Sequence, residues 1–260
     1  MLTAIPARRG ERVVVLAGPG AARAQRGVRV LAGITGATVV NTVGAKGLLA
    51  WDDPLHGGTV GLQEGDAALA ELMSADLVVT TGLDPGESVS LTAALAARHG
   101  DLVDVDPAHL ALAAGGWPPA DGPGARPPFY AAVAAVAGPL YQREGSAPWA
   151  AARLAADRPD GGLVVAPPGP TGFWVGRTFP TATPGSVVVP AGRTAGTAEE
   201  IARAAARAGR PTTLVVPAPV AIEGVTVEVW DEGMTGGEPL AALVAVAGPP
   251  DAAVWPGWVP

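Results

Sequence analysis

The residues best suited to chemistry gather in one segment of the chain, at 41–68. It contains the only lysine, Lys46, two adjacent carboxylates, Asp52 and Asp53, and a histidine, His56. An amine can pair with an anion, and a histidine can bind a ligand or move a proton near neutral pH. Simpler roles compete with these: Lys46 as a solvated loop cation, the aspartates as turn formers, and His56 as a local hydrogen-bonding residue. We favour the simpler roles for all four.

A glycine-rich turn at 17–23, AGPGAAR, is the second candidate. Free backbone N–H groups around Gly18 and Gly20 would cradle a phosphate where a strand meets a helix. A dinucleotide fingerprint has a third glycine where Arg23 stands, and an acidic residue at the end of the second strand that is missing here. A plain tight turn and a phosphate or cofactor site therefore remain equal alternatives, and conventional NAD binding is less favoured than either.

Composition excludes several other kinds of chemistry. The chain of 260 residues has no cysteine, three histidines and a formal net charge of -7. Thiolate catalysis, zinc–thiolate sites and iron–sulfur clusters are therefore ruled out, and an acidic chain is a poor nucleic-acid binder. The sequence also lacks three catalytic motifs. These are the nucleophile elbow of hydrolases, the Walker lysine loop that binds nucleoside triphosphates, and the paired-histidine zinc motif. We expect no metal site and no nucleic-acid partner.

The elements that position these residues follow an alternating strand–helix pattern in the first half. Apolar, β-branched runs predict strands at 13–18, 37–42, 76–84 and 101–106. The stretches between them predict helices, apart from a loop at 44–65. This order indicates an α/β fold with a Rossmann-like parallel sheet covered by helices on both faces. Ligands of such sheets gather at the carboxyl ends of the strands.

The second half is expected to be a smaller, less regular α/β unit. A stretch rich in proline and glycine at 115–128 indicates a boundary. Beyond it we expect helices at 129–144, 148–156 and 197–209, the last with Thr197 as N-cap, and strands at 162–167, 186–191, 212–219, 225–230 and 242–248. The predicted division is a Rossmann-type domain at 1–115, a linker with helices at 116–160 and a second unit at 161–260.

The mean hydropathy of +0.30 raises the question of a membrane span. Every apolar run is interrupted by glycine, proline, aspartate or arginine well before the roughly 20 residues that a span requires. The first residues also lack the pattern of a secretory signal. We therefore expect no membrane partner and a cytoplasmic location.

The first 110 residues resemble the central domain of thiamine-diphosphate-dependent enzymes of the acetolactate synthase and benzoylformate decarboxylase type. Four segments follow that family's order: AGPGA at 17–21, VVNTVGAKGLLAWDDPLHGGTVG at 39–61, SADLVVTTGLD at 74–84 and DLVDVDPAHL at 101–110. The region after 160 resembles, more faintly, the start of the family's cofactor domain. The resemblance implies a domain of the DHS-like NAD/FAD-binding kind.

In some relatives the central domain binds FAD or another nucleotide, and the resemblance transfers that role to matching positions. These would be Gly18, Gly20, Thr42, Gly44, Lys46, Gly61, Gly82, Asp84 and Asp106. Two features of the FAD binders differ here. The chain has GLQEG at 61–65 in place of a Gly-Met-His-Gly turn, and Leu83 in place of an arginine. The resemblance keeps FAD or another nucleotide as one alternative for the cofactor, although these two features differ.

The family's catalytic groups have no counterpart in this sequence. Relatives bind magnesium and diphosphate through a Gly-Asp-Gly motif followed by an asparagine, and this chain has no such motif and no asparagine after Asn41. Their activating glutamate lies in a separate N-terminal domain. We therefore expect no catalytic and no metal-binding residue in this chain, and no autonomous binding of thiamine diphosphate and magnesium.

Three functions remain open on these grounds. The favoured one is a non-catalytic subunit or remnant, structural or nucleotide-binding, that pairs with itself as a homo-oligomer or with a separately encoded thiamine-diphosphate-enzyme chain. The second is one subunit of a split decarboxylase or carboligase acting on 2-oxo acids, resembling acetolactate synthase. The third is an independent FAD- or NAD-binding redox protein.

Overall fold

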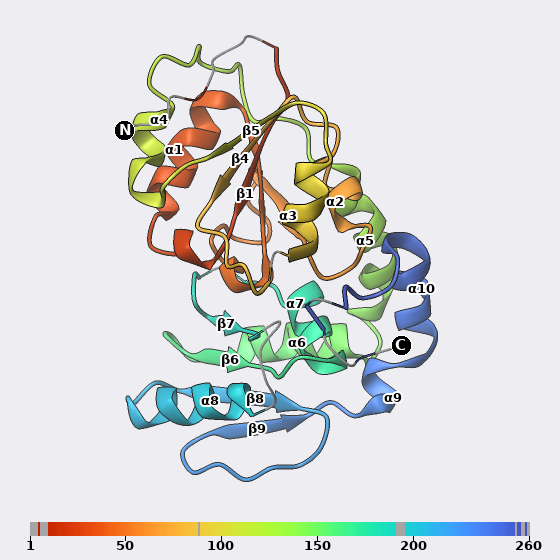
Figure 1. The fold of residues 1–260 in the computed structure, drawn as a ribbon. Coiled ribbons are helices and arrows are strands. Elements are labelled where there is room, and N and C mark those ends of the chain that lie inside the picture. The colour runs from red at the N-terminus through yellow and green to blue at the C-terminus, as the bar shows by residue number, and fades with distance from the viewer. Residues whose placement is uncertain are drawn as a thin grey trace.

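The structure is a computed structural model that describes residues 5, 10–87, 89–181, 183–190, 196–252, 254, 255 and 258. Its strands form two parallel sheets, one in each half of the chain, with helices packed around both (Figure 1). This is the α/β fold that the sequence predicts.

The first sheet has five parallel strands in the order β3-β2-β1-β4-β5. They are β1 (Val13–Ala17), β2 (Thr38–Asn41), β3 (His56–Thr59), β4 (Leu77–Thr81) and β5 (Asp101–Asp104). The helices around it are α1 (Gln25–Thr35), α2 (Asp66–Leu69), α3 (Val89–Ala96), α4 (Leu110–Ala113) and α5 (Pro128–Leu140). The order reverses between β1 and β4, which makes the carboxyl ends of these two strands the usual ligand site of such a fold.

Both faces of this sheet are buried, which explains the unbroken apolar run of its central strand. Val13 and Val15 of β1 pack in the cluster that contains α1 and α4 residues. Val14 and Leu16 pack on the opposite face, with residues of α2 and α3 and with Phe129 of α5. Side chains alternate across a strand, so a strand covered on both faces must be apolar throughout.

The carboxyl ends of β1 and β4 are in direct backbone contact. The N–H of Gly18 donates to the carbonyl of Thr81 at 2.9 Å, and the N–H of Gly20 donates to the carbonyl of Gly82 at 2.9 Å. A Cβ at Gly18 would lie 2.4 Å from the Gly82 carbonyl oxygen. Glycine is required here because two backbones approach too closely for any side chain.

The second sheet has four parallel strands in the order β7-β6-β8-β9. They are β6 (Leu163–Val165), β7 (Val187–Val188), β8 (Thr212–Val216) and β9 (Thr226–Val229). The surrounding helices are α6 (Ala147–Asp157), α7 (Pro170–Thr178), α8 (Thr197–Arg207), α9 (Glu232–Thr235) and α10 (Gly237–Ala247). Residues of α8 cover one face, and the other face packs on a larger cluster that includes α6, α7 and α10.

The two halves share that larger hydrophobic cluster. Val43 and Leu62 of the first half lie in it beside Phe173 and Trp174 of α7. A Cβ at Gly176 of α7 would lie 2.7 Å from the Leu62 side chain, so a glycine lets the helix come close. Two short helical elements of the first half, η1 (Pro19–Ala21) and η2 (Val43–Ala45), follow β1 and β2 at the same end of the first sheet.

Most predicted elements occur close to their expected positions, and three expectations were wrong. The segment 44–65 was expected to be a loop, yet it contains the edge strand β3, whose sequence HGGT has none of the usual β-branched pattern. The segment 242–248 was expected to be a strand, and it lies in α10. The N-cap of α8 is Gly196, and Thr197 is the first helical residue.

The structure also bears on the membrane question. No helix within the described residues is long and apolar enough to cross a membrane.

The backbone contact at the first sheet's carboxyl end can be tested by adding single methyl groups. Gly18→Ala forces a Cβ into the Gly82 carbonyl, and we expect it to lower the free energy of unfolding by about 1–3 kcal/mol. Gly33→Ala is the matched control, because that glycine lies in α1 with no atom within 4 Å of its added Cβ. The control should raise stability by about 0.5–1 kcal/mol in urea denaturation. Equal effects of the two substitutions would contradict this account.

Candidate functional site

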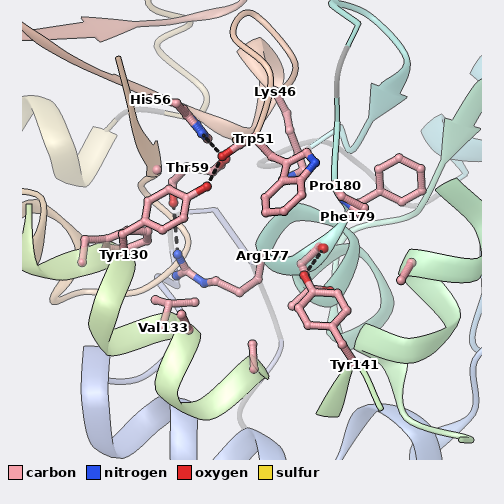
Figure 2. A pocket seen from close by; sticks show the side chains of 16 residues that line it. Lys46, Trp51, His56, Thr59, Tyr130, Val133, Tyr141, Arg177, Phe179 and Pro180 are labelled. Atoms are coloured by element: carbon pink, nitrogen blue, oxygen red, sulfur yellow. Dashed lines mark hydrogen bonds between the residues drawn. The ribbon is translucent and has the colours of Figure 1, made fainter. Parts of the chain in front are cut away.

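A cavity of about 330 Å³ lies where the edge of the first sheet meets α5 and α7, and we call it the Lys46 cavity (Figure 2). Its walls are mainly aromatic and aliphatic, with a small number of polar groups. They comprise Lys46, Trp51, His56, Gly58, Thr59, Phe129, Tyr130, Val133, Ala134, Ala137, Tyr141, Ala152, Arg177, Thr178, Phe179 and Pro180. Apolar walls with few convergent polar groups are typical of small-molecule sites.

Lys46 is the most unusual group in this wall. It follows η2 and is only 6% exposed. Within the described part of the chain its ammonium has no hydrogen bond and no ion pair. Burial, together with the nearby positive charge of Arg177, lowers the pKa of Lys46 from 10.5 to about 7. The amine is therefore a mixture of neutral and charged forms near neutral pH.

His56, the first residue of β3, is fixed by its neighbours. Its Nε2 lies 3.0 Å from Oδ1 of Asn41, and its Nδ1 lies 3.3 Å from the carbonyl oxygen of Trp51. The Asn41 amide nitrogen donates to the carbonyl of Thr42 at 2.8 Å, so its oxygen faces the imidazole. Burial lowers the pKa of His56 to about 4, so the ring is neutral at physiological pH and donates through one of its two nitrogens.

Arg177 brings the two halves of the chain together beneath the cavity. Its side chain is 1% exposed and pairs with the fully buried Asp66 at 2.9 Å. It also donates to the carbonyl of Thr59 at 3.0 Å and to Oε1 of Gln63 at 2.9 Å. The guanidinium carbon lies 5.2 Å from the ring centre of Phe129, within range of a cation–π contact. Its Nε is buried without a partner.

Asp66 has the complementary set of contacts. Its Oδ2 accepts hydrogen bonds from the N–H groups of Leu62 at 2.8 Å and Gln63 at 3.0 Å. Burial raises the pKa of Asp66, and Arg177 and these N–H groups oppose that increase. The charge of Arg177 is therefore balanced locally, in contrast to the charge of Lys46.

Aromatic residues close the cavity on its other sides. The Tyr130 hydroxyl donates to the carbonyl of Trp51, and the Tyr141 hydroxyl donates to the carbonyl of Thr178 (Figure 2). Burial raises the pKa of both tyrosines, so both hydroxyls are protonated. Trp51 is 48% exposed, which places it at the boundary between cavity and solvent.

The structure divides the nine residues predicted to bind a cofactor among several places. Only Lys46 lines the cavity. Gly18, Gly20 and Gly82 form the backbone contact between β1 and β4, in which the Gly18 N–H donates to the Thr81 carbonyl and the Gly20 N–H donates to the Gly82 carbonyl. The tight-turn alternative is therefore the one that the geometry favours for this glycine motif.

The hydrogen-bond donors of Thr42 and Gly44 bind a carboxylate of the protein itself. The Thr42 hydroxyl and the Gly44 N–H, at 2.8 Å, both donate to the carboxylate of Glu87. A Cβ at Gly44 would lie 2.7 Å from that carboxylate, and Glu87 is itself buried. The position where these donors would meet a phosphate thus contains a carboxylate of the protein. The arrangement does not fit a nucleotide phosphate.

The remaining three predicted positions have local structural roles. Gly61 has a φ of +85°, and its added Cβ would meet Leu91 at 2.9 Å. Asp84 accepts a hydrogen bond from the N–H of Gly86 at 2.6 Å. Asp106 caps the short helical element η3 (Pro107–His109) by accepting from the N–H of Ala108 at 2.8 Å.

The simpler interpretations of the 41–68 segment hold for two residues and fail for one. Asp53 organises the turn as expected, by accepting from the N–H of Leu55 at 2.9 Å. His56 is a hydrogen-bonding residue, as expected. Lys46 was expected to be a solvated loop cation, and this was wrong because the loop turns inward against the second half. A Cβ at Gly47 would lie only 2.4 Å from the carbonyl oxygen of Thr183.

Arg177, Tyr130 and Tyr141 were not among the sequence candidates. Arginine supplies all but one of the 17 basic residues, so the presence of an arginine at position 177 did not distinguish it from the others. One cue existed: Arg177 is the single charged residue in the helix α7, PTGFWVGRT, whose residues are all buried except Pro170. A charge in a buried helix requires a partner, and that requirement could have singled it out.

The family comparison agrees with the first sheet. The family model for the thiamine pyrophosphate enzyme central domain matches residues 8–114. Residues 8–114 belong to that central-domain family. They include every strand of the first sheet and Lys46. No curated protein matches the sequence.

One solved structure extends the likeness into the second half. It is the X-ray structure of a candidate thiamin diphosphate-dependent enzyme from Mycobacterium smegmatis, with 19% sequence identity and a TM-score of 0.56. The match covers 79% of this chain and 45% of that protein, so this chain spans less than half its length. At this identity the likeness concerns the fold of the chain.

The second sheet does not fit a magnesium–diphosphate group. The loop after β6 reads Ala-Pro-Pro-Gly-Pro. It contains no side-chain carboxylate or carboxamide, and its prolines have no backbone N–H. A Cβ at Gly172 would lie 2.2 Å from the carbonyl oxygen of Pro167, so the turn is closely packed. No group of three potential ligands for a metal ion occurs among the described residues. Magnesium binding needs such oxygen ligands.

The buried ion pair can be tested by removing its anion. Asp66→Asn leaves the Arg177 guanidinium buried and uncompensated, and we expect a loss of about 3–5 kcal/mol in the free energy of unfolding. The matched control is Glu228→Gln, which breaks the more exposed pair with Arg153. That variant should lose less than about 1 kcal/mol in the same urea titration. A loss at Asp66 as small as the control's would contradict the proposed importance of the pair.

Lys46 gives a pH-dependent prediction. Between its folded pKa of about 7 and its ordinary value of 10.5, the unfolded chain binds a proton that the folded chain does not. Stability should therefore rise with pH over this window, by about 1 kcal/mol per pH unit. Lys46→Met should flatten the rise in urea midpoints measured from pH 7 to 9.5. An unchanged slope in the variant would show that Lys46 is not buried in solution.

Proposed function

We propose that this chain is a non-catalytic relative of the thiamine pyrophosphate enzymes that binds a compact, mostly apolar carboxylate in the Lys46 cavity. The observation that carries the proposal is the buried ammonium of Lys46, which lacks a counter-charge within the described residues. A buried charge is costly unless it is paired. A ligand carboxylate would supply the missing partner.

Charge selects the anionic end of this ligand. Arg177 is already paired with Asp66, so Lys46 supplies the positive charge that is available to a ligand. The neighbouring His56 is neutral because burial lowers its pKa to about 4. A single carboxylate therefore matches the cavity better than a diphosphate, because among the described residues that line it only Lys46 has a positive charge not already paired with a carboxylate.

Size and wall chemistry select the rest of the ligand. A volume of about 330 Å³ lies at the lower end of the about 300–1,000 Å³ typical of ligand pockets. Phe129, Tyr130 and Phe179 contribute aromatic surface, and the alanines on α5 leave room for a flat group. Benzoate is a suitable probe, because it joins one carboxylate to one apolar ring.

The structural details favour this ligand over the nucleotide and thiamine alternatives. The donors of Thr42 and Gly44 already bind Glu87, where a nucleotide phosphate would need them. The loop after β6 lacks oxygen ligands for magnesium. These features support a binding role for the chain by itself, whether it acts alone, as an oligomer or beside a separately encoded catalytic chain.

Calorimetric titration of the purified chain with benzoate tests the proposal. We expect saturable binding at pH 6.5, where Lys46 is mostly charged, and quenching of Trp51 fluorescence at the cavity boundary. Lys46→Met should weaken binding at least about tenfold, which is about 1.4 kcal/mol. Arg26→Met, which removes an exposed cation of α1, is the control and should leave the affinity unchanged.

The same titration with other ligands separates the rival functions. Micromolar, magnesium-dependent binding of thiamine diphosphate would overturn the non-catalytic proposal. A yellow preparation, or tight binding of FAD or NAD, would favour the redox alternative. Failure of benzoate and of its ring-substituted analogues to bind would remove the carboxylate proposal itself.

A further inference from the structure

We infer that Lys46 also acts as a nucleophile, forming an imine with a compact aromatic aldehyde that enters the same cavity. The inference deepens the proposed function, since it rests on the same cavity and names a second class of ligand. Its basis is geometric: one amine faces an apolar chamber, and no described side chain is bonded to it. A lysine desolvated in an apolar pocket is a typical imine-forming group.

The surroundings of Lys46 keep a large fraction of the amine in its reactive, neutral form. The charged group that faces it is Arg177, which repels a second positive charge and is held by Asp66 behind it. His56, Tyr130 and Tyr141 also line the cavity and are neutral at physiological pH. The pKa of about 7 means that roughly half of the Lys46 amine is unprotonated at pH 7.

The reaction needs no reagent besides the aldehyde. The Nζ lone pair of Lys46 attacks the carbonyl carbon, the new C–N bond forms, and a proton moves from nitrogen to oxygen to give a carbinolamine. The C–O bond then breaks, the oxygen leaves as water with both amine hydrogens, and a C=N bond remains. No electron transfer occurs, so the step is balanced by the release of one water molecule.

The cavity walls favour the imine over its hydrolysis. Phe129, Tyr130 and Phe179 provide aromatic surface beside the amine, and Trp51 stands between the cavity and solvent. The Tyr130 hydroxyl is committed to the Trp51 carbonyl, and the Tyr141 hydroxyl to the Thr178 carbonyl. Apolar walls disfavour water, and less water favours the condensed product.

Borohydride trapping with benzaldehyde tests the inference directly. The chain is incubated with the aldehyde at pH 7.5, and sodium borohydride reduces any imine to a stable benzylamine, which peptide mass spectrometry locates. The chain has a single lysine, so the competing amine is the N-terminal one. We expect labelling of Lys46 at least about tenfold faster than labelling of the N-terminus. Equal or slower labelling of Lys46 would overturn the inference.

Three variants keep the test specific. Lys46→Arg retains a positive charge without a nucleophilic amine, and only N-terminal labelling should remain. Ala137→Leu fills the cavity while Lys46 stays in place, and it should slow labelling of Lys46 at least about fivefold. Ala131→Leu on the same helix lies outside the cavity and is the matched control, with an unchanged rate. Equal rates in the two alanine variants would place the reaction outside the cavity.

Benzoate and benzaldehyde give separable outcomes. Benzoate binding without trapping of Lys46 would overturn the imine and leave the proposed function intact. Trapping of Lys46 without benzoate binding would support the imine and overturn the carboxylate proposal. Loss of both would show that the cavity does not accept compact aromatic ligands, and both proposals would fall.

Discussion

The pairing of Arg177 with Asp66 is the interaction on which the rest of the molecule depends. Arg177 lies in the second half of the chain, and its partners Asp66, Gln63 and Thr59 all lie in the first. Neither charge reaches water, so each requires the other to offset its desolvation. Gln63 continues the network by donating to the carbonyl of Gly248, beyond α10. One ion pair thereby fixes the separation of the two sheets and the floor of the cavity between them.

This pairing also determines the electrostatics of the Lys46 cavity. Because Arg177 is paired with Asp66, Lys46 is the one cation among the described residues lining the cavity that has no ion-pair partner, and its pKa is about 7. Had Asp66 been absent, two buried cations would repel each other, and neither would be tolerated. The same arrangement therefore stabilises the join between the halves and leaves Lys46 chemically available.

Sequence patterns predicted the parts of the fold that depend on local chemistry. The strand β1 was found because a strand covered on both faces must be apolar, and α8 because a capping signal at Thr197 marked its beginning to within one residue. The edge strand β3 escaped because its HGGT sequence is stabilised by pairing with β2. The strand expected at 242–248 was a helix because the all-apolar run ALVAVA fits a buried strand and a half-buried helix equally well.

The candidate site was less predictable, because it is assembled from both halves. The burial of Lys46 depends on contact between its loop and Thr181 and Thr183. The role of Arg177 depends on an aspartate more than one hundred positions away. Residue types and local spacing cannot predict contacts between residues that lie this far apart in the sequence. The glycine motif at 17–23 illustrates the converse case, since its residue types allow a phosphate turn and only the observed backbone contact favours a tight turn.

Glu87 gives the first sheet a property that its family resemblance would not suggest. Its carboxylate is attached to the same chain as the Thr42 and Gly44 donors that it binds, so it behaves as a tethered ligand at an effective concentration that free molecules rarely match. An incoming phosphate would have to expel this carboxylate and leave a buried negative charge beside its own. The Thr42 and Gly44 donors are thus already bonded within the chain, whereas the Lys46 amine faces a cavity.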